Sequence, residues 1–298
     1  MPFDLVCILG PTASGKTSIA TKLAASINGE IISADSRQVY RDMNIGTGKD
    51  LIEFKKNNVD YHLIDIAEPA DEYNVFRFLK DFTAAYDAIR NNNKIPILVG
   101  GTGLYLSAVI QSYSFPEVTD FESDNLEKLT LSELRELLRM LNPRLHNVTD
   151  LNSRERLVKA IIIGHSGENA NERKISLNSL NIGIKLNREE IKSRITERLK
   201  SRLSGGMIEE VESLLQKGIT PDKLNYFGLE YRFISQHVSG KLSYNDMYQK
   251  LNSAIHTFAK KQMTWFRKME REGVEINWFH PEHYDEIKKF VLSKLFDE

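Results

Sequence analysis

Residues 5–20, LVCILGPTASGKTSIA, contain the two elements and the turn that decide the fold. The apolar run at 5–9 predicts a buried β-strand, and the apolar positions within residues 16–27 recur at helical spacing. Between them, residues 10–17 match the phosphate-binding pattern G-x-x-x-x-G-K-[ST]. Such a turn presents backbone N–H groups and the positive end of a helix to an anion. The pattern predicts a phosphoanion site without naming a reaction, and a strand-to-helix turn with no ligand is the alternative.

All eight positions of this loop are expected to line the phosphate site. They are Gly10, Pro11, Thr12, Ala13, Ser14, Gly15, Lys16 and Thr17. Lys16 places a full positive charge against the phosphates, and the Thr17 hydroxyl is suited to bind Mg²⁺. Magnesium is therefore the expected cofactor, with Thr17 as its expected protein ligand.

The first third of the chain alternates short apolar runs with helical patterns. After the first strand, we expect strands at residues 30–34, 61–66 and 95–99, and helices at 75–90 and 104–110. Strand–helix alternation of this kind is typical of a parallel sheet with helices on both faces. The sequence therefore predicts an α/β fold with a P-loop NTPase-like parallel sheet flanked by helices.

The pattern changes near residue 113, where a proline and several acidic residues indicate a linker. Strand character resumes at 181–186. Helical patterns otherwise dominate the second half, at about 126–140, 154–164, 188–203, 207–216 and 245–270. We therefore expect a discontinuous core of residues 1–112 and 183–298, interrupted by a helical insertion at 113–182.

Composition bounds the class of protein. The chain has 298 residues, of which 41% are hydrophobic and 27% charged, and its formal net charge is -1. These values suit a globular protein with one or two domains, so any basic surface for nucleic acid must be local. The single cysteine, Cys7, cannot form an internal disulfide, which favours a reducing compartment. Because no apolar stretch reaches the roughly 20 residues of a membrane span, a cytoplasmic protein with no membrane partner is expected.

Polar residues follow directly on two further predicted strands. Asp35 and Ser36 come after the second strand, and Thr102 lies in a glycine cluster after the fourth. Because ligands in open α/β sheets bind outside the carboxyl ends of strands, both groups are expected to face the phosphate loop. Asp35 would there bind a metal or accept a proton, or it would only cap a short helix over RQVYRD, and position alone favours neither. Arg37 and Gln38 are suited to hydrogen-bond a nucleobase or phosphate.

Several motifs together make the interpretation specific. GPTASGKT at 10–17, SADSRQVYRDMNIGTGK at 33–49, HLIDI at 62–66 and PILVGGTGLYL at 96–106 occur in an order and with gaps that resemble the tRNA dimethylallyltransferases, or isopentenyl transferases. LNSRERLVKAI is similar to the tRNA-contacting helix of that family, and FAKKQMTWFRK to its C-terminal signature. The resemblance covers about residues 4–270.

The resemblance implies a donor, an acceptor and residue roles. The loop would hold the pyrophosphate of dimethylallyl pyrophosphate, and the dimethylallyl group would pass to the exocyclic amino nitrogen of the adenosine adjacent to the anticodon in tRNA. Asp35 matches the base, Thr102 a threonine near the reacting amine, and Arg198 the arginine that stabilises pyrophosphate. The chemistry agrees, because an adenine amine must lose a proton and a departing pyrophosphate is eased by cations.

The resemblance also implies contacts with the anticodon stem-loop, for which an ordinary amphipathic helix at 154–164 is the alternative. The matching residues are Asp35, Ser36, Arg37, Gln38, Thr102, Glu155, Arg156, Leu157, Val158, Lys159, Arg232 and Lys260. The chain departs from the family pattern at Glu155, Glu230 and His256, which concerns tRNA contacts and not transfer. It lacks a C-terminal Cys/His pattern, and a monomer is expected.

The arginines of the helix expected at 188–203 form one stripe, because Arg194, Arg198 and Arg202 recur every four residues. The family match favours an active-site role for Arg198. Arg202 is instead expected on a solvated face. Farther along, residues 250–268 contain five Lys or Arg residues and no acid, which suits either a phosphate backbone or a plain exposed face. Trp265 and Phe266 are expected in the core rather than stacked on bases.

Three other functions share parts of the pattern. An enzyme that prenylates free adenine nucleotides would need the same loop and Asp35, although the insertion argues against it. A small-molecule kinase would use the loop for ATP. A non-catalytic RNA-binding module would not need Lys16, Thr17 and Asp35 intact.

Overall fold

The computed structural model describes residues 2–112, 129–141, 154, 157–158, 161 and 176–296. The chain divides into two compact units, residues 1–112 with 176–298, and residues 113–175. The expected core and insertion are thus both present, but the second boundary lies at 175/176 rather than 182/183. The reason is the strand Ser179–Ile184, whose residues pair with the first strand of the chain and so belong to the core.

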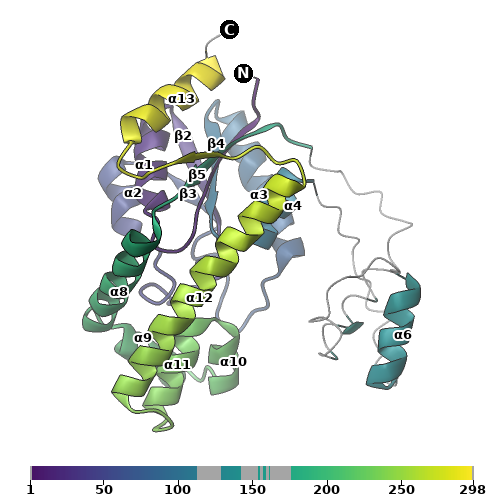
Figure 1. The fold of residues 1–298 in the computed structure, drawn as a ribbon, viewed down its shortest axis with the longest axis vertical. Helices are drawn as coiled ribbons and strands as arrows, with labels where there is room; N and C mark the ends of the chain where they lie inside the picture. The colour runs from purple at the N-terminus through teal and green to yellow at the C-terminus, as the bar shows by residue number, and fades with distance from the viewer. Residues whose placement is uncertain are drawn as a thin grey trace. The chain divides into compact units, whose positions relative to one another are not determined.

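The core is built on a six-stranded sheet with the order β3-β2-β4-β1-β5-β6 (Figure 1). Its strands are β1 (Leu5–Leu9), β2 (Gly29–Ala34), β3 (Tyr61–His62), β4 (Ile95–Gly100), β5 (Ser179–Ile184) and β6 (Asn277–Phe279). Every neighbouring pair is parallel, as the sequence predicts. The residues of β1, β2 and β4 are all buried, because helices cover both faces and leave no side for polar residues.

One face of the sheet packs against α1 (Lys16–Ser26), α2 (Leu51–Asn57) and α13 (Tyr284–Phe296), which share a single apolar cluster with it. The other face carries α3 (Val75–Asn91), which contacts β2 and β4, and α4 (Gly103–Ile110) beside it. Phe78 of α3 stacks on Tyr105 of α4 with 4.2 Å between ring centroids. Because these helices cover the two faces of the sheet, the carboxyl ends of the strands are followed by loops that these helices do not cover.

The remaining core helices pack on one another in the lower part of Figure 1. They are α8 (Arg188–Ser204), α9 (Met207–Gln216), α10 (Pro221–Tyr226), α11 (Leu229–Val238) and α12 (Tyr244–Arg271). The sequence predicted α8, α9 and α12 to within one residue at each end. It did not predict α10, α11, α2, α13 or β6. Phe266 is fully buried in α12, which confirms its expected core position.

Two local expectations are wrong. The third strand ends at His62 rather than residue 66, because Leu63 and Asp65 adopt left-handed φ values of 62° and 58° that a strand cannot contain. The segment RQVYRD forms turns rather than a helix, and Tyr40 within it bridges to Ala67. Asp35 therefore does not cap a helix there.

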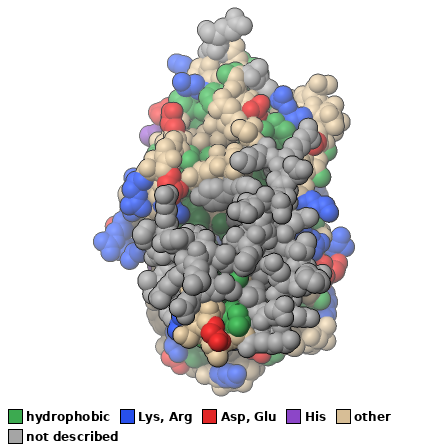
Figure 2. All heavy atoms as spheres, turned by 90° about the vertical axis from the view of Figure 1, so that its right-hand side faces the viewer, with side chains coloured by type: hydrophobic (Ala, Val, Ile, Leu, Met, Phe, Trp, Pro, Cys, Tyr) green, Lys and Arg blue, Asp and Glu red, His purple; other side chains and the backbone are tan. Residues whose placement is uncertain are grey.

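The insertion unit contains α6 (Leu131–Leu141) and helical residues at 154, 157–158 and 161. Leu134, Leu138, Leu157 and Ile161 are buried together and form its small apolar cluster. Among the described residues, no helix is both long enough and apolar enough to cross a membrane. On the face shown in Figure 2, basic and acidic side chains are interspersed over the described surface, in keeping with the net charge of -1.

Candidate functional site

The phosphate loop joins β1 to α1 with the backbone shape that its glycines permit. Gly15 is the N-cap of α1 and has φ 86°, in the left-handed region. Ala13 shares that region with φ 62°, an uncommon conformation for a residue with a Cβ. A Cβ on Gly10 would lie 2.7 Å from the carbonyl oxygen of Ile184 in β5, so only glycine fits. The loop therefore has a preset, strained curl at the positive end of α1.

Lys16 lies within this curl, where its Nζ donates to the carbonyl oxygen of Pro11 at 3.4 Å. Burial and the positive charge of Arg198 lower the Lys16 pKa to about 8. The hydroxyl of Ser14 is buried and has no hydrogen-bond partner among the described residues. A bound anion would stabilise the charged form of Lys16 and would accept a hydrogen bond from the Ser14 hydroxyl.

Arg198 reaches the loop from α8, whose first turn is fixed by a capping box between Asn187 and Glu190. Its Nη1 donates to the Thr12 hydroxyl at 3.2 Å. The structure therefore brings Arg198 to the phosphate loop from more than 180 positions away in the sequence, where the resemblance expects it. Arg194, one turn earlier, lies beside Gly15.

Arg202 is not on a solvated face, contrary to the sequence-based expectation. Its side chain is 14% exposed, donates from Nη1 to the carbonyl oxygen of Gly46 at 3.3 Å, and lies 3.8 Å from the Glu230 carboxylate. Burial and Arg198 lower the Arg202 pKa to about 10, and burial raises the pKa of Glu230. The periodicity located Arg202 correctly on the stripe, but the 40–49 loop and Glu230 of α11 cover Arg202 there. Arg198, Arg202 and Glu230 line a pocket with Thr12 and Ala13.

The second strand end and the glycine cluster meet beside the loop. The backbone N–H of Ser36 donates to the Thr102 hydroxyl at 3.2 Å. Asp35 Oδ1 accepts from the N–H groups of Arg37 at 2.9 Å and Gln38 at 3.3 Å, which holds the turn after β2. Asp35 also acts electrostatically on Lys16. The structure therefore brings Asp35, Thr102 and the phosphate loop to one edge of the sheet, as the sequence predicts.

Arg37 and Gln38 make contacts within the protein. The Arg37 guanidinium lies 4.8 Å from the ring centroid of Tyr226. The Gln38 side chain accepts from Ser33 Oγ at 3.0 Å and donates to the carbonyl oxygen of Gly48 at 3.0 Å. In this structure Gln38 holds the following loop, a role that its position alone did not indicate.

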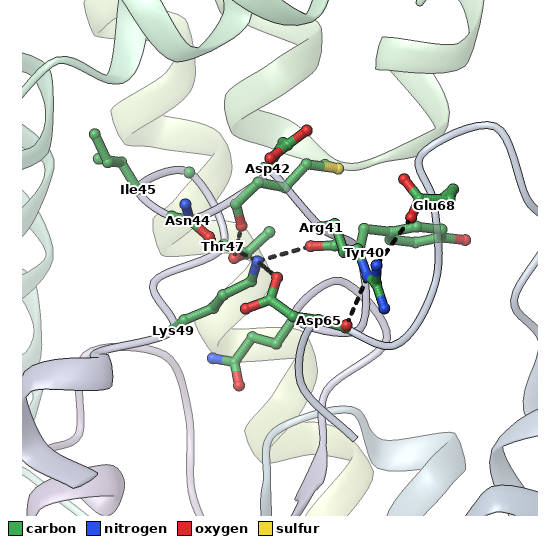
Figure 3. A network of polar contacts seen from close by, with 12 residues as sticks. Tyr40, Arg41, Asp42, Asn44, Ile45, Thr47, Lys49, Asp65 and Glu68 are labelled. Carbon is green, nitrogen blue, oxygen red and sulfur yellow. Dashed lines mark hydrogen bonds and ion pairs between the residues drawn. The ribbon is translucent and has the colours of Figure 1, made fainter. Parts of the chain in front are cut away.

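That following loop, residues 40–49, is held by a buried ammonium group (Figure 3). Lys49 is 1% exposed, and its Nζ donates to the Tyr40 carbonyl at 2.7 Å, to Asn44 Oδ1 at 2.8 Å and to the Asp65 carboxylate. From α9, the Glu210 carboxylate accepts from three successive backbone N–H groups of the loop, residues 44–46. Neither Lys49 nor Glu210 was predicted from the sequence, although the motif GTGK ends on Lys49.

The glycine cluster after β4 is shaped by protein contacts. A Cβ on Gly101 would lie 2.4 Å from Gln262 Nε2, and a Cβ on Gly103 would lie 2.3 Å from Trp265 Cγ. Trp265 is half-buried, and its Nε1 donates to Ser107 Oγ at 2.8 Å, which confirms packing rather than a free stacking surface. Gly101 and Gly103 therefore allow side chains of α12 to pack against the backbone, whereas the sequence suggested that a ligand approaches there.

The remaining residues of the expected tRNA surface fall into three groups. Glu155, Arg156 and Lys159 lie outside the described residues. Leu157 is fully buried in the insertion cluster and Val158 packs against it, as in the amphipathic-helix alternative. Lys260 is exposed on α12 and Arg232 lies over the ring of Phe233 at 4.4 Å, so neither is drawn into the loop.

Thr17 is the second residue of α1 and is partly buried. The described residues contain no group of three or more His, Cys, Asp or Glu side chains able to hold a metal ion. Oxygen donors at this edge are the Thr17 hydroxyl and nearby carboxylates such as Asp35. This set fits Mg²⁺, which takes few protein ligands and completes its shell with phosphate oxygens and water.

Comparisons with known proteins agree with one another. The sequence matches the IPP transferase family over residues 38–269 and the isopentenyl transferase family over residues 3–62. It is 50% identical to tRNA dimethylallyltransferase 1 of Geotalea uraniireducens, covering 93% of each chain, and 48% identical to tRNA dimethylallyltransferase 2 of Bacteroides fragilis, covering 98% of each. The structure superimposes on a tRNA isopentenylpyrophosphate transferase from Bacillus halodurans with TM-score 0.73 and 30% identity, covering 98% and 96% of the two chains.

Proposed function

We propose a reaction from one premise, that this chain belongs to the IPP transferase family. The protein transfers a dimethylallyl group from dimethylallyl pyrophosphate to the exocyclic amino nitrogen of the adenosine adjacent to the anticodon in tRNA. The single observation that carries this proposal is that cationic side chains and a carboxylate lie side by side at one edge of the sheet. Lys16 and Arg198 gather positive charge at the phosphate loop, and Asp35 offers a carboxylate at the neighbouring strand end.

On the leaving-group side, the loop amides, Lys16 and Arg198 bind the pyrophosphate. The C–O bond of the donor breaks, and its electron pair leaves with pyrophosphate, whose charge these groups neutralise. The lowered pKa of Lys16 reflects burial and a neighbouring cation, and an incoming anion reverses that penalty. Binding energy is therefore available where negative charge builds up.

On the acceptor side, Asp35 takes the proton that the adenine amine loses as its nitrogen bonds to the allylic carbon. A positioned base of this kind contributes about 10²- to 10⁴-fold to rate. Thr102 lies one hydrogen bond from Ser36 and is placed to orient the amine. The adenine must leave its stack to enter this site, at a cost of a few kcal/mol for a base in a loop.

Magnesium is part of the proposal. The Thr17 hydroxyl would hold the ion together with pyrophosphate oxygens, and the bound ion would supply additional charge neutralisation for the leaving group. We likewise propose that Arg232, Lys260 and residues 154–161 contact the anticodon stem-loop, that the protein is a monomer and that it is cytoplasmic. A cation-rich face without acids, as along residues 250–268, suits a phosphate backbone.

Mass spectrometry of anticodon-loop nucleosides tests the proposal. Purified protein, unmodified tRNA, Mg²⁺ and dimethylallyl pyrophosphate should give an adenosine heavier by one dimethylallyl group, with equimolar pyrophosphate. AMP in place of tRNA tests the enzyme that modifies free nucleotides, and ATP labelled in the γ-phosphate tests a kinase. Label on an acceptor, or prenylation of AMP with none of tRNA, would contradict the proposal.

A further inference from the structure

One buried side chain of α12 connects the two halves of the site. Gln262 is 7% exposed. Its Oε1 accepts from the backbone N–H of Thr12 in the phosphate loop at 2.8 Å. Its Nε2 donates to the carbonyl oxygen of Gly101, directly before Thr102, at 2.8 Å. The amide thus spans the carboxyl ends of β1 and β4 and uses its acceptor on one and its donor on the other.

We propose that Gln262 is a positioning residue that fixes the separation between the pyrophosphate loop and the acceptor side of the site. The inference rests on the proposed function, because it assigns those two sides. Gln262 touches neither reacting group, and it acts through the backbone of Thr12 and Gly101.

The contacts form one continuous chain across the site. Arg198 Nη1 donates to the Thr12 hydroxyl at 3.2 Å, and Gln262 joins Thr12 to Gly101. The next residue, Thr102, accepts from the N–H of Ser36 at 3.2 Å. Groups assigned to the leaving pyrophosphate are therefore linked to the turn that carries the base. A shift at Gln262 would move the two against each other.

The geometry around Gln262 leaves it little freedom. Glycine is the only residue type that fits at position 101. A Cβ there would lie 2.4 Å from Gln262 Nε2 and 3.1 Å from the Gly10 carbonyl oxygen. Phe266, one turn later on α12, is fully buried, and Trp265 is hydrogen-bonded to Ser107. A rigid helix thus holds the amide.

The chemistry of transfer makes this separation important. Displacement at carbon needs the reacting atoms within about 3–3.5 Å and aligned, and a misplacement of about 1 Å costs roughly 100-fold in rate. Only a side chain with both an acceptor and a donor serves Thr12 and Gly101 together. Methionine has no donor and only a weak sulfur acceptor, whereas a protonated glutamic acid offers both a donor and an acceptor.

The test compares Gln262→Met, Gln262→Glu and a matched control, Gln249→Glu, which makes the same substitution at an exposed position of the same helix. Thermal melting first establishes that each variant is folded. Single-turnover transfer to tRNA is then measured from pH 5.5 to 9, and the affinity for inorganic pyrophosphate is measured by calorimetry over the same range.

Gln262→Met should lower the transfer rate about 10- to 100-fold with the KM for tRNA within about 2-fold of wild type, because alignment and not tRNA binding is lost. Gln262→Glu should be rescued at low pH, since only its protonated form donates to Gly101. Its rate relative to wild type should therefore fall as pH rises, while Gln249→Glu tracks wild type throughout. A purely structural role would change the melting temperature with pH but not the rate of the folded protein.

A Gln262→Glu rate that stays constant and more than 2-fold below wild type from pH 5.5 to 9 would overturn the inference, and so would a Gln262→Met rate within 2-fold of wild type. The pH series remains decisive if Gln262→Met fails to fold. Pyrophosphate affinity gives a separate readout, with an expected weakening of about tenfold in Gln262→Met. A wild-type protein that binds pyrophosphate in this Gln262-dependent way but does not prenylate tRNA would overturn the proposed function alone.

Discussion

The two ends of the parallel sheet handle charge in opposite ways. At the carboxyl end, Lys16 lies near Arg198 and Arg202, and burial with this repulsion lowers the Lys16 pKa to about 8. At the amino end, Glu30 is 5% exposed but is bound by Lys94 at 2.6 Å and His62 at 2.6 Å. These partners more than offset the burial of Glu30 and hold its pKa below the ordinary value.

The difference separates a binding end from a structural end. Buried positive charges that repel one another destabilise the empty protein, and a bound anion relieves that cost. The Glu30 cluster is already neutralised and gains nothing from a ligand. Changes at the carboxyl end should therefore alter activity and ligand affinity, and changes at the amino end should alter stability alone.

The largest effect is expected from Asp35→Asn. Asparagine still accepts from the N–H groups of Arg37 and Gln38 through Oδ1, so the turn after β2 is kept. The base is lost, and the single-turnover rate should fall about 10²- to 10⁴-fold. Affinity for tRNA, measured by filter binding, should stay within about 2-fold.

The matched control is Asp42→Asn, an exposed aspartate of the same segment that pairs with Lys217 at the surface. It should transfer at the wild-type rate. An Asp35→Asn protein as fast as this control would show that another group removes the proton.

An intermediate effect is expected from pH acting on Lys16. The pKa lies near 8 in the ligand-free protein, and an anion favours the charged form, so binding takes up a proton above that pH. Affinity for inorganic pyrophosphate should therefore fall as pH rises through about 8. Lys16→Met should weaken binding about 10- to 100-fold at pH 7, in line with about 1.5–3 kcal/mol for charge-assisted hydrogen bonds.

Lys16→Arg provides the control, because a guanidinium stays charged over this pH range. The pH dependence of its affinity therefore reflects only the titration of pyrophosphate itself. Calorimetry from pH 6.5 to 9.5 on the two proteins isolates the lysine. Parallel curves for wild type and Lys16→Arg would remove Lys16 as the group that couples binding to pH.

The binding end was predictable from sequence where its geometry is local. The loop between β1 and α1 follows from glycine spacing, and the position of Asp35 follows from the rule for strand ends. Arg198 needed the family resemblance. Arg202 was misplaced, because the periodicity of α8 predicts a stripe but not the distant loop and carboxylate that cover its last arginine.

Contacts between distant segments escaped prediction for the same reason. Gln262 lies 250 positions from Thr12, and nothing in its neighbourhood distinguishes it from another glutamine in an amphipathic helix. The early end of β3 depends on left-handed φ values at Leu63 and Asp65, and leucine is a residue type that does not signal such a φ. The Glu30 cluster draws on three separate segments and has no local pattern at all.

The smallest effect is expected from Glu30→Gln, which should lower the free energy of unfolding by about 1–2 kcal/mol at pH 7 and leave the transfer rate unchanged. Because the Glu30 pKa is lower in the folded protein, its contribution is fully present above the unfolded value near 4.5 and is lost as pH falls through the folded value. Urea unfolding at pH 7 and at lower pH should therefore show a difference in unfolding free energy between wild type and variant that closes on acidification.

Glu212→Gln, an exposed control, should show no difference from wild type at either pH. A difference between wild type and Glu30→Gln that stays constant on acidification would mean that Glu30 stabilises the sheet by packing and not by charge, and the contrast between the two ends would then fail.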